Sequence, residues 1–380
     1  MSKAWTRGGG RRRHTFGSRI ASVVAWSFGL ASISPAATHY VVPVNPGALS
    51  PYTSWATAAT NIQDAIGAAA YGETVLVSNG VYATGGVVTY GAMTNRVALT
   101  NGVTVQSANG AAVTTIQGQG PMGNGAVRCA YVGTDCRLRG FTLTSGATLA
   151  EGDHYNQQSG GAVWCGIGAI VSSCVIRGNA ASYGGGGAYR GTLNNCTLTG
   201  NSASHGGAAV WGALQDCTLA SNSATWHGGA AAWCALYNCT LTGNAANETG
   251  GGGGGAYGGT LTNCMLTGNS ASHGGAAAFA TLTNCTLSRN SAACNGGGIS
   301  GGAANNCLVR ANTADNGGGA WGGILNNCTL SYNKANYSGG GAFGCTVNNG
   351  LLRANTAVNG GGAWGGILNN CTLAHNEAAC

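Results

Sequence analysis

The 380-residue chain contains 70 glycines and only 7% charged residues, whereas globular proteins average about 7% glycine and about 25% charge. This composition argues against a conventional helical core, yet the 44% hydrophobic share also excludes disorder caused by low hydrophobicity. The formal net charge of +7 would favour anionic partners if the basic residues were spread along the chain.

The first 36 residues have the pattern of a secretory signal peptide. Six of the 16 basic residues precede residue 20, an apolar run covers residues 20–33, and small residues follow at 34–37. The run is too short to span a bilayer, so we expect cleavage near Ala36 and export, either by secretion or to a bacterial cell surface or outer membrane. Removing this segment leaves ten basic against nine acidic residues, which excludes nucleic acid as an expected partner. We predict no transmembrane helix in the mature chain.

Residues 37–72 are predicted to form an N-terminal cap. Ile62, Ala65 and Ile66 have helical apolar spacing, and strand-like segments follow at 72–77 and 80–82. This order resembles the start of pectin-lyase-like β-helix proteins, where a short amphipathic helix covers the open end of the solenoid. The resemblance implies a β-helix over residues 73–380. A cap is also physically required, because an open coil exposes core and strand edges.

The segment 149–159 interrupts the pattern before regular repeats begin at about residue 160. It holds Glu151, Asp153 and His154, the densest ionisable group of the mature chain. With Arg177 and Arg190 from the following coils, these residues would form the site of a polysaccharide lyase or glycoside hydrolase of pectin-lyase-like fold. Catalysis is the alternative interpretation, because enzymes of that fold need several converging acidic groups and the repeats here have few.

One motif recurs at steps of 21 or 22 residues, apart from a step of 25 at the glycine run 250–255. Each copy has a cysteine, an aliphatic residue two positions later and an asparagine five positions later. The cysteines are Cys174, Cys196, Cys217, Cys239, Cys264, Cys285, Cys307, Cys328 and Cys371, with Gly350 in one slot. The asparagines are Asn179, Asn201, Asn222, Asn244, Asn269, Asn290, Asn312, Asn333, Asn355 and Asn376.

These repeats predict a right-handed parallel β-helix solenoid with one coil per repeat. Strand side chains alternate with period two, so cysteine and aliphatic residue share the inner face, and equivalent residues stack about 4.8 Å apart. The asparagines would form hydrogen-bonded ladders at the turns. A leucine-rich-repeat-like solenoid is the alternative, since Leu193, Cys196, Leu198 and Asn201 fit its template. Paired glycines oppose the helical segment that this alternative requires.

The repeats also resemble those of polymorphic outer-membrane protein passengers, which belong to autotransporters. The resemblance covers about residues 160–380 and rests on Gly-Gly-Ala-Val-Trp at 160–164, Gly-Gly-Gly-Ala-Trp at 317–321 and 360–364, and Leu-x-x-Asn at 198–201. The chain departs from that family by using Leu for Phe and a large aromatic residue for an aliphatic one. The resemblance implies architecture and an adhesin-like role, and it implies no activity.

An aromatic column follows the glycine pairs. Its members are Trp164, Tyr189, Trp211, Trp233, Tyr257, Phe279, Trp321, Phe343 and Trp364. We expect this column to point inward, because a monomer rarely leaves so large an apolar stripe in water. If it points outward, Trp164, Trp211, Trp233, Trp321 and Trp364 would form a flat platform for sugar rings.

Sixteen cysteines in an exported chain suggest disulfides. We expect the column cysteines to remain mainly reduced, because parallel in-register side chains give an awkward disulfide torsion. The better candidates for pairing lie off the column: Cys129, Cys136, Cys165, Cys234, Cys294, Cys345 and Cys380. The chain lacks a Cys-x-x-Cys pair, and we interpret His205, His227 and His273 as a solvated turn column, so we expect no metal site and no cofactor.

The sequence thus predicts an exported, nearly uncharged solenoid that acts without catalysis as a monomeric surface or secreted passenger. Its expected partners are polysaccharides or a host or neighbouring cell surface. The chain stops at residues 377–380, part way through a repeat, which suggests a truncated reading frame.

Overall fold

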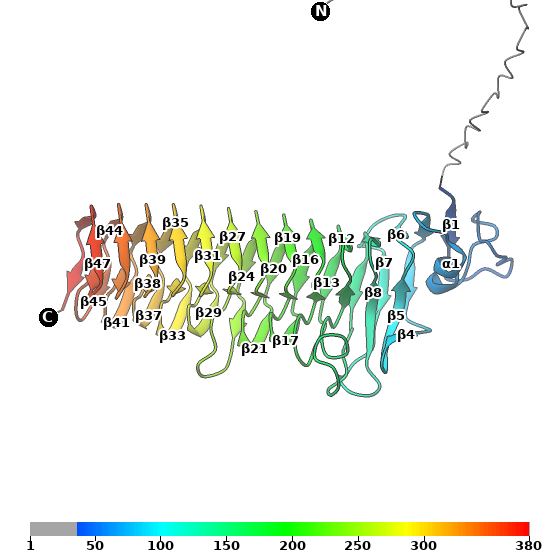
Figure 1. The fold of residues 1–380 in the computed structure, drawn as a ribbon, viewed down its shortest axis with the longest axis horizontal. Helices are drawn as coiled ribbons and strands as arrows, with labels where there is room; N and C mark the ends of the chain where they lie inside the picture. The colour runs from blue at the N-terminus through cyan, green and yellow to red at the C-terminus, as the bar shows by residue number, and fades with distance from the viewer. Residues whose placement is uncertain (1–35, 380) are drawn as a thin grey trace, which may run out of the picture. The chain divides into compact units, whose positions relative to one another are not determined.

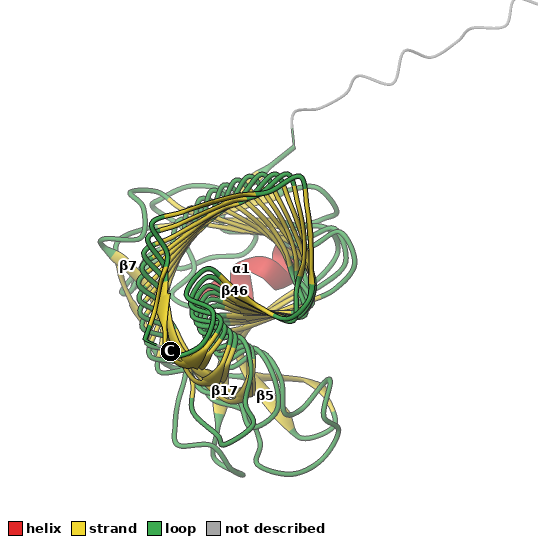
Figure 2. Ribbon diagram, turned by 90° about the vertical axis from the view of Figure 1, so that its left-hand side faces the viewer, coloured by secondary structure: helices red, strands yellow, loops and turns green. Residues whose placement is uncertain are grey.

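In the computed structural model, which describes residues 36–379, the chain forms a parallel β-helix (Figures 1 and 2). Four sheets run along the solenoid, and we name them A, B, C and D. Within a regular coil the chain visits them in the order A, B, D, C. Most of the predicted signal peptide, residues 1–35, and Cys380 lie outside the described residues.

Sheets A and B form two sides of the coil. Sheet A contains β1 (Thr38–Val41), β2 (Thr74–Val77), β6 (Thr104–Ser107), β9 (Arg137–Arg139), β12 (Ile170–Ser172), β15 (Thr192–Asn194), β19 (Ala213–Gln215), β23 (Ala235–Tyr237), β27 (Thr260–Thr262), β31 (Thr281–Thr283), β35 (Ala303–Asn305), β39 (Ile324–Asn326), β43 (Thr346–Asn348) and β47 (Ile367–Asn369). Sheet B contains β3 (Gly80–Tyr82), β7 (Thr114–Gln117), β10 (Thr142–Thr144), β13 (Val175–Arg177), β16 (Thr197–Thr199), β20 (Thr218–Ala220), β24 (Thr240–Thr242), β28 (Met265–Thr267), β32 (Thr286–Ser288), β36 (Leu308–Arg310), β40 (Thr329–Ser331), β44 (Leu351–Arg353) and β48 (Thr372–Ala374).

Sheets D and C complete each coil. Sheet D contains β17 (Ser202–His205), β21 (Ser223–His227), β25 (Ala245–Ala246), β29 (Ser270–His273), β33 (Ser291–Asn295), β37 (Thr313–Asn316), β41 (Lys334–Ser338), β45 (Thr356–Ala357) and β49 (Glu377–Ala378). Sheet C contains β4 (Val87–Tyr90), β5 (Met93–Leu99), β8 (Val127–Val132), β11 (Val163–Cys165), β14 (Ala188–Tyr189), β18 (Ala209–Val210), β22 (Ala231–Ala232), β26 (Ala256–Tyr257), β30 (Ala277–Ala278), β34 (Ile299–Ser300), β38 (Ala320–Trp321), β42 (Ala342–Phe343) and β46 (Ala363–Trp364). The β4–β5 pair is antiparallel, and the strands that stack along the solenoid are parallel.

The predicted parallel β-helix is therefore confirmed. The leucine-rich-repeat alternative is wrong, because the segment after each asparagine forms short strands of sheets D and C, as in β17 and β18. The described residues contain a single α-helix, α1 (Ile62–Ala68). It begins after Asn61, whose side chain accepts a hydrogen bond from the Gln63 amide, and it buries Ile62, Ala65 and Ile66, as the apolar spacing predicts.

The core is a column of apolar layers inside the coils. Leu193 of sheet A, Leu198 of sheet B and Ala188 of sheet C are each fully buried, and their equivalents repeat along the solenoid. Burying one leucine stabilises a fold by roughly 1.5–3 kcal/mol. Because each coil buries its apolar residues against its neighbours, a single coil cannot fold alone.

The predicted asparagine ladder lies at the turn between sheets B and D. The Nδ2 of Asn201 donates to the Ile176 carbonyl at 2.9 Å and to Oδ1 of Asn222 at 3.0 Å. The same Oδ1 accepts the Asn201 backbone amide at 3.0 Å. This pattern recurs from Asn179 to Asn355, so each buried amide both satisfies the turn and joins the next coil.

Several loops leave the regular coil on one edge, which is the lower edge in Figure 1. They include the β4–β5 hairpin, the 149–159 insertion and the segment between β25 and β26. Their common side brings them beside sheets C and D, and the end view shows the same clustering (Figure 2).

Candidate functional site

Aromatic rings form a continuous ladder along sheet C. We call Tyr131, Trp164, Tyr189, Trp211, Trp233, Tyr257 and Phe279 the aromatic ladder. In that order, consecutive ring centroids are separated by 4.9, 6.2, 5.7, 5.7, 5.7 and 5.7 Å. These separations lie in the range of about 4.5–7 Å where aromatic pairs attract each other. The ladder joins seven successive coils.

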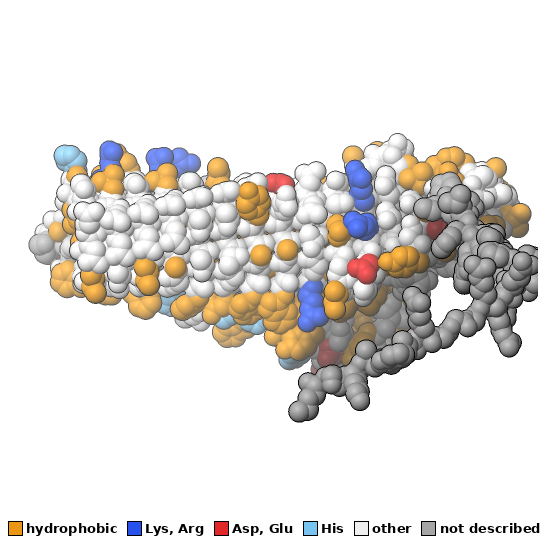
Figure 3. Space-filling model, turned by 45° about the horizontal axis from the view of Figure 1, so that its top comes forward, with side chains coloured by type: hydrophobic (Ala, Val, Ile, Leu, Met, Phe, Trp, Pro, Cys, Tyr) orange, Lys and Arg blue, Asp and Glu red, His pale blue; other side chains and the backbone are white. Residues whose placement is uncertain are grey.

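The aromatic ladder lies outside the core, which corrects the expectation that it points inward. In β14, Ala188 belongs to the core, and Tyr189 belongs to a separate outer cluster with Val210 and Ala232. Neighbouring strand residues point to opposite faces, so the Tyr189 side chain leaves sheet C on its outer side. Trp233 is 36% exposed and Phe279 is 59% exposed. Hydrophobic and histidine side chains gather along the lower edge of the body in Figure 3.

The rings come from two register positions, whereas the sequence predicted one column. Trp164 pairs with Tyr189 within sheet C, and Tyr189 pairs with Val210. Trp211 and Trp233 each come one residue after the position that is in register with Tyr189, and their φ angles are positive, at 54° and 53°. A signal is visible in the sequence: Trp211, Trp233 and Phe279 lie five residues after the first glycine of their coil, whereas Trp164, Trp321, Phe343 and Trp364 lie four residues after it.

Small residues in the next coil give the shifted rings their space. A Cβ on Gly258 would lie 2.8 Å from Cδ1 of Trp233, and a Cβ on Gly301 would lie 3.1 Å from the Phe279 ring. Both glycines also have positive φ, which disfavours a side chain there. The Trp233 and Phe279 rings therefore pack against glycines of the following coil.

Two histidines line the ladder from sheet D. His205 and His227 are in register, with ring centroids 5.5 Å apart, and His227 stacks on Tyr257 at 4.1 Å. Burial lowers the pKa of both histidines, so both are neutral at neutral pH. Burial also raises the pKa of Tyr189 to about 12. Within the described part of the chain, Nδ1 of both histidines and Oη of Tyr189 have no hydrogen-bond partner.

A cleft of ≈ 310 Å³ opens at the C-terminal end of the ladder. It lies between the loop that precedes β26 and the rings, and it is lined by His227, Gly250, Gly252, Tyr257, His273, Phe279, Asn295, Ser300 and Trp321. Asn295 Nδ2 lies 3.3 Å from His273 Nδ1. The volume is at the lower end of the range of about 300–1,000 Å³ for ligand pockets, and the lining combines aromatic walls with a few polar groups.

The 149–159 insertion covers the N-terminal half of the ladder. Tyr155 lies 5.6 Å from Trp211 between ring centroids, and its carbonyl accepts a hydrogen bond of 3.0 Å from Nε1 of Trp164. His154 stacks on Tyr183 at 4.7 Å. The insertion thus adds aromatic surface to the ladder, and it holds a peptide carbonyl against an indole.

The five predicted catalytic residues do not converge. Oδ1 of Asp153 accepts the backbone amides of Tyr155 and Asn156 at 3.0 and 2.6 Å, which closes a turn of the insertion. Glu151 is exposed in the same loop, and Arg177 is exposed on sheet B. The Arg190 guanidinium lies 5.2 Å from the Tyr189 ring centroid.

Arg128 holds the base of the insertion, a role that no sequence pattern predicted. It is almost completely buried and donates to the carbonyls of Gly160, Asn156 and Ser159 at 2.8, 2.9 and 2.8 Å. It also donates to Oδ1 of Asn95 at 2.8 Å. Burial lowers the pKa of Arg128 to about 9. The guanidinium is thus held by neutral oxygens alone, and it ties three segments together.

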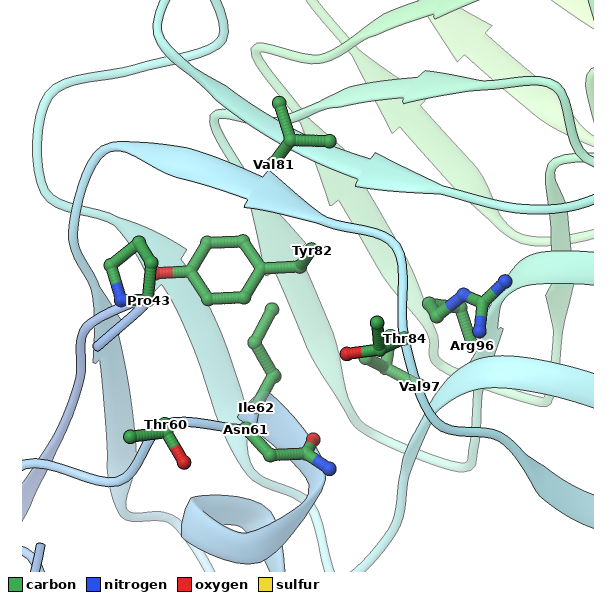
Figure 4. Close-up of a pocket in the computed structure, with 9 residues that line it drawn as sticks. All are labelled: Pro43, Thr60, Asn61, Ile62, Val81, Tyr82, Thr84, Arg96 and Val97. Atoms are coloured by element: carbon green, nitrogen blue, oxygen red, sulfur yellow. The ribbon is translucent and has the colours of Figure 1, made fainter. Parts of the chain in front are cut away.

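A second, smaller cavity lies between the cap and the first coils (Figure 4). Its volume is ≈ 70 Å³, and Ile62, Tyr82 and Arg96 lie on its walls. Arg96 donates to the carbonyls of Gln117 and Gly85. This volume holds a few water molecules and no sugar ring. We therefore assign the cavity to cap packing.

Two classes of site receive no support from the described residues. Residues 36–379 contain no cluster of three or more side chains able to hold a metal ion. The same residues contain no helix long and apolar enough to cross a membrane.

No family model and no curated protein matches this chain. Solved structures overlap it loosely. Pectate lyase Pel9A is 14% identical with a TM-score of 0.41, covering 90% of this chain and 79% of the other. The A-module of the mannuronan C-5 epimerase AlgE6 from Azotobacter vinelandii is 16% identical with a TM-score of 0.42, covering 83% and 95%. The Dettilon tailspike protein is 9% identical with a TM-score of 0.40, covering 89% and 68%.

Proposed function

We propose that this chain is an exported, non-catalytic β-helix protein that binds glycan chains along the aromatic ladder, as a surface or secreted adhesin-like passenger. The observation that carries the proposal is the outward run of seven contacting rings. Trp211, Trp233 and Phe279 are exposed in its C-terminal half, and a contiguous exposed apolar patch marks an interaction surface in a monomeric protein. The apolar C–H face of a sugar ring packs on aromatic rings, which supply large contact areas.

The surroundings of the aromatic ladder favour an uncharged glycan. The half-buried His205 and His227 are neutral at neutral pH, and Arg190 already lies over the Tyr189 ring. Asn295, Ser300 and His273 provide hydrogen-bonding groups in the cleft for sugar hydroxyls. Adjacent coils are about 4.8 Å apart, so a linear chain along the solenoid would meet a new ring at each coil from Trp211 to Phe279.

Affinity electrophoresis in gels that contain neutral or uronate-rich polysaccharides tests the proposal. We expect retardation by at least one neutral polysaccharide and a loss of affinity of at least about tenfold in Trp233→Ala and Phe279→Ala, equivalent to about 1.4 kcal/mol. Trp55→Ala is the matched control, because Trp55 is 46% exposed on the cap, away from the ladder. Equal losses in Trp55→Ala, or no retardation on any neutral polysaccharide, would contradict the proposal.

The same samples address polysaccharide cleavage. We expect no change in polymer length after incubation, because the Asp153 carboxylate already accepts two backbone amides. Cleavage that disappears in both Asp153→Ala and Glu151→Ala would establish the catalytic alternative in place of the binding role.

A further inference from the structure

One ring interrupts the accessible surface of the aromatic ladder. Tyr189 is completely buried, whereas the other six rings of the ladder are at least partly exposed. Tyr189 lies between Trp164 and Trp211, with ring centroids 6.2 and 5.7 Å away. A ligand that lies along the ladder therefore loses contact with the rings at Tyr189. The run of rings that a ligand can reach without interruption begins at Trp211.

Tyr155 of the insertion lies across the ladder at this point. Its carbonyl accepts the hydrogen bond of 3.0 Å from Nε1 of Trp164, and its ring centroid lies 5.6 Å from that of Trp211. Tyr155 thus contacts the rings on both sides of the buried Tyr189. Gly160, directly after the insertion, packs close to Tyr189 as well, because a Cβ there would lie 3.1 Å from the Tyr189 Cβ. The insertion therefore forms a wall across the ladder.

Hydrogen bonds hold this wall at both of its ends. At the C-terminal end, the buried Arg128 donates to the carbonyls of Asn156 and Ser159 at 2.9 and 2.8 Å. At the N-terminal end, Oγ of Ser182 in the next coil donates to the Leu149 carbonyl at 2.7 Å. Buried polar networks whose members are paired make a structure rigid. The wall is therefore a fixed part of the solenoid surface.

The opposite end of the accessible run opens into the cleft. Ser300 occupies the strand position in register with Ala278 and Trp321, so a small residue replaces a ring in the coil after Phe279. This position lies in the cleft of ≈ 310 Å³, and the partly exposed Trp321 lines the same cleft. The accessible rings are thus closed off at Tyr155 and lead into open space beyond Phe279.

We propose that the aromatic ladder binds the end of a neutral glycan chain, with the terminal sugar packed against Tyr155 and Trp211. The following sugars lie over Trp233, Tyr257 and Phe279, and the rest of the chain leaves the protein through the cleft. This inference rests on the glycan-binding function proposed above. An extended chain that continued beyond its terminal sugar would need the space that Tyr155 fills. The wall thus selects chain ends by excluding internal segments.

Isothermal titration calorimetry with two fractions of one linear neutral polysaccharide tests the proposal, where the chains of one fraction are half as long as those of the other. Mixed-linkage β-glucan, glucomannan and pullulan are the probes. We expect the shorter fraction to offer twice as many binding sites per gram, with an unchanged Kd per site, because it has twice as many chain ends. Equal numbers of sites per gram would overturn end recognition and leave glycan binding intact. The absence of binding to every probe would overturn both proposals.

Two tyrosine variants locate the terminal sugar. Tyr155→Ala removes the ring against which that sugar packs, so it should raise the Kd of the shorter fraction by at least about tenfold. Tyr71→Ala is the matched control, because Tyr71 is an exposed ring between α1 and β2, away from the ladder, and its loss should leave the Kd unchanged. An unchanged Kd in Tyr155→Ala, or an equal rise in Tyr71→Ala, would overturn the placement of the chain end at Tyr155.

Discussion

Replacing Asn244 by alanine tests the asparagine ladder at its centre. Asn244 is fully buried, and its Nδ2 donates to the Leu219 carbonyl at 3.0 Å and to Oδ1 of Asn269 at 2.9 Å. Its Oδ1 accepts the backbone amide and Nδ2 of Asn222 at 2.9 and 3.0 Å. The substitution therefore removes four hydrogen bonds at once.

The size of the loss in free energy of unfolding depends on which hydrogen-bonding groups around Asn244 keep a partner. Oδ1 of Asn269 keeps the Asn244 backbone amide, so it stays satisfied. Two donor hydrogens of Asn222 and the bond to the Leu219 carbonyl are lost inside the core. Each unsatisfied buried group costs roughly 1–3 kcal/mol, so we expect Asn244→Ala to lower the free energy of unfolding by about 3–6 kcal/mol.

Asn348→Ala is the matched control. Asn348 also exchanges side-chain hydrogen bonds with asparagines in both neighbouring coils, at 2.8 Å each, but it lies half-buried on the outer face of sheet A. Water can replace those bonds, so we expect a loss of about 0.5–1.5 kcal/mol. Urea unfolding followed by circular dichroism gives both values, and hydrogen exchange shows whether coils near Asn244 open first. Comparable losses in the two variants would refute the assignment of ladder stability to buried amides.

Two further predictions concern the aromatic ladder. Gly258→Ala should destabilise the fold by about 1–2 kcal/mol and change tryptophan fluorescence, because the positive φ of Gly258 disfavours a side chain and the added Cβ would strike Trp233. Gly365→Ala is the control. Gly365 has a similar φ of 63° with open space around its Cβ, so this substitution should leave the fluorescence unchanged. His205 and His227 have lowered pKa values when folded, so the unfolded chain binds more protons below about pH 6.5 and stability should fall as pH decreases through that value. The melting temperature of wild type should fall relative to that of the His205→Gln/His227→Gln variant as the pH decreases from 8 to 5 (about the range where histidine titrates), and parallel curves would contradict this assignment.

The regular coils could be predicted because each local preference repeats. The spacing of Cys196, Leu198 and Asn201 requires period-two alternation followed by a turn, and the structure has β16 ending just before Asn201. The cap helix could be predicted equally well, because Asn61 marks its start and the apolar spacing of Ile62 and Ile66 marks its buried face. Repetition thus makes a weak local signal reliable.

The candidate site was harder to predict because it depends on backbone conformation outside the repeat. The prediction that the aromatic column points inward treated Trp211 and Trp164 as equivalent positions. In the structure, Trp211 lies one residue further along its coil and adopts a left-handed backbone conformation. Arg128 could not be assigned either, because its four oxygen partners come from segments far apart in sequence. Single-coil reasoning cannot reveal such contacts.

The in-register stacking of coils also has a mechanical consequence. A force pulling on the two ends of the solenoid loads the coil interfaces one after another, since each coil contacts only its neighbours. A coil of 22 residues extends to about 75 Å when stretched, against a rise of about 4.8 Å when folded, so its release lengthens the chain by about 70 Å. The longer coil between Cys239 and Cys264 would release roughly 10 Å more, which would mark its place in a single-molecule extension trace.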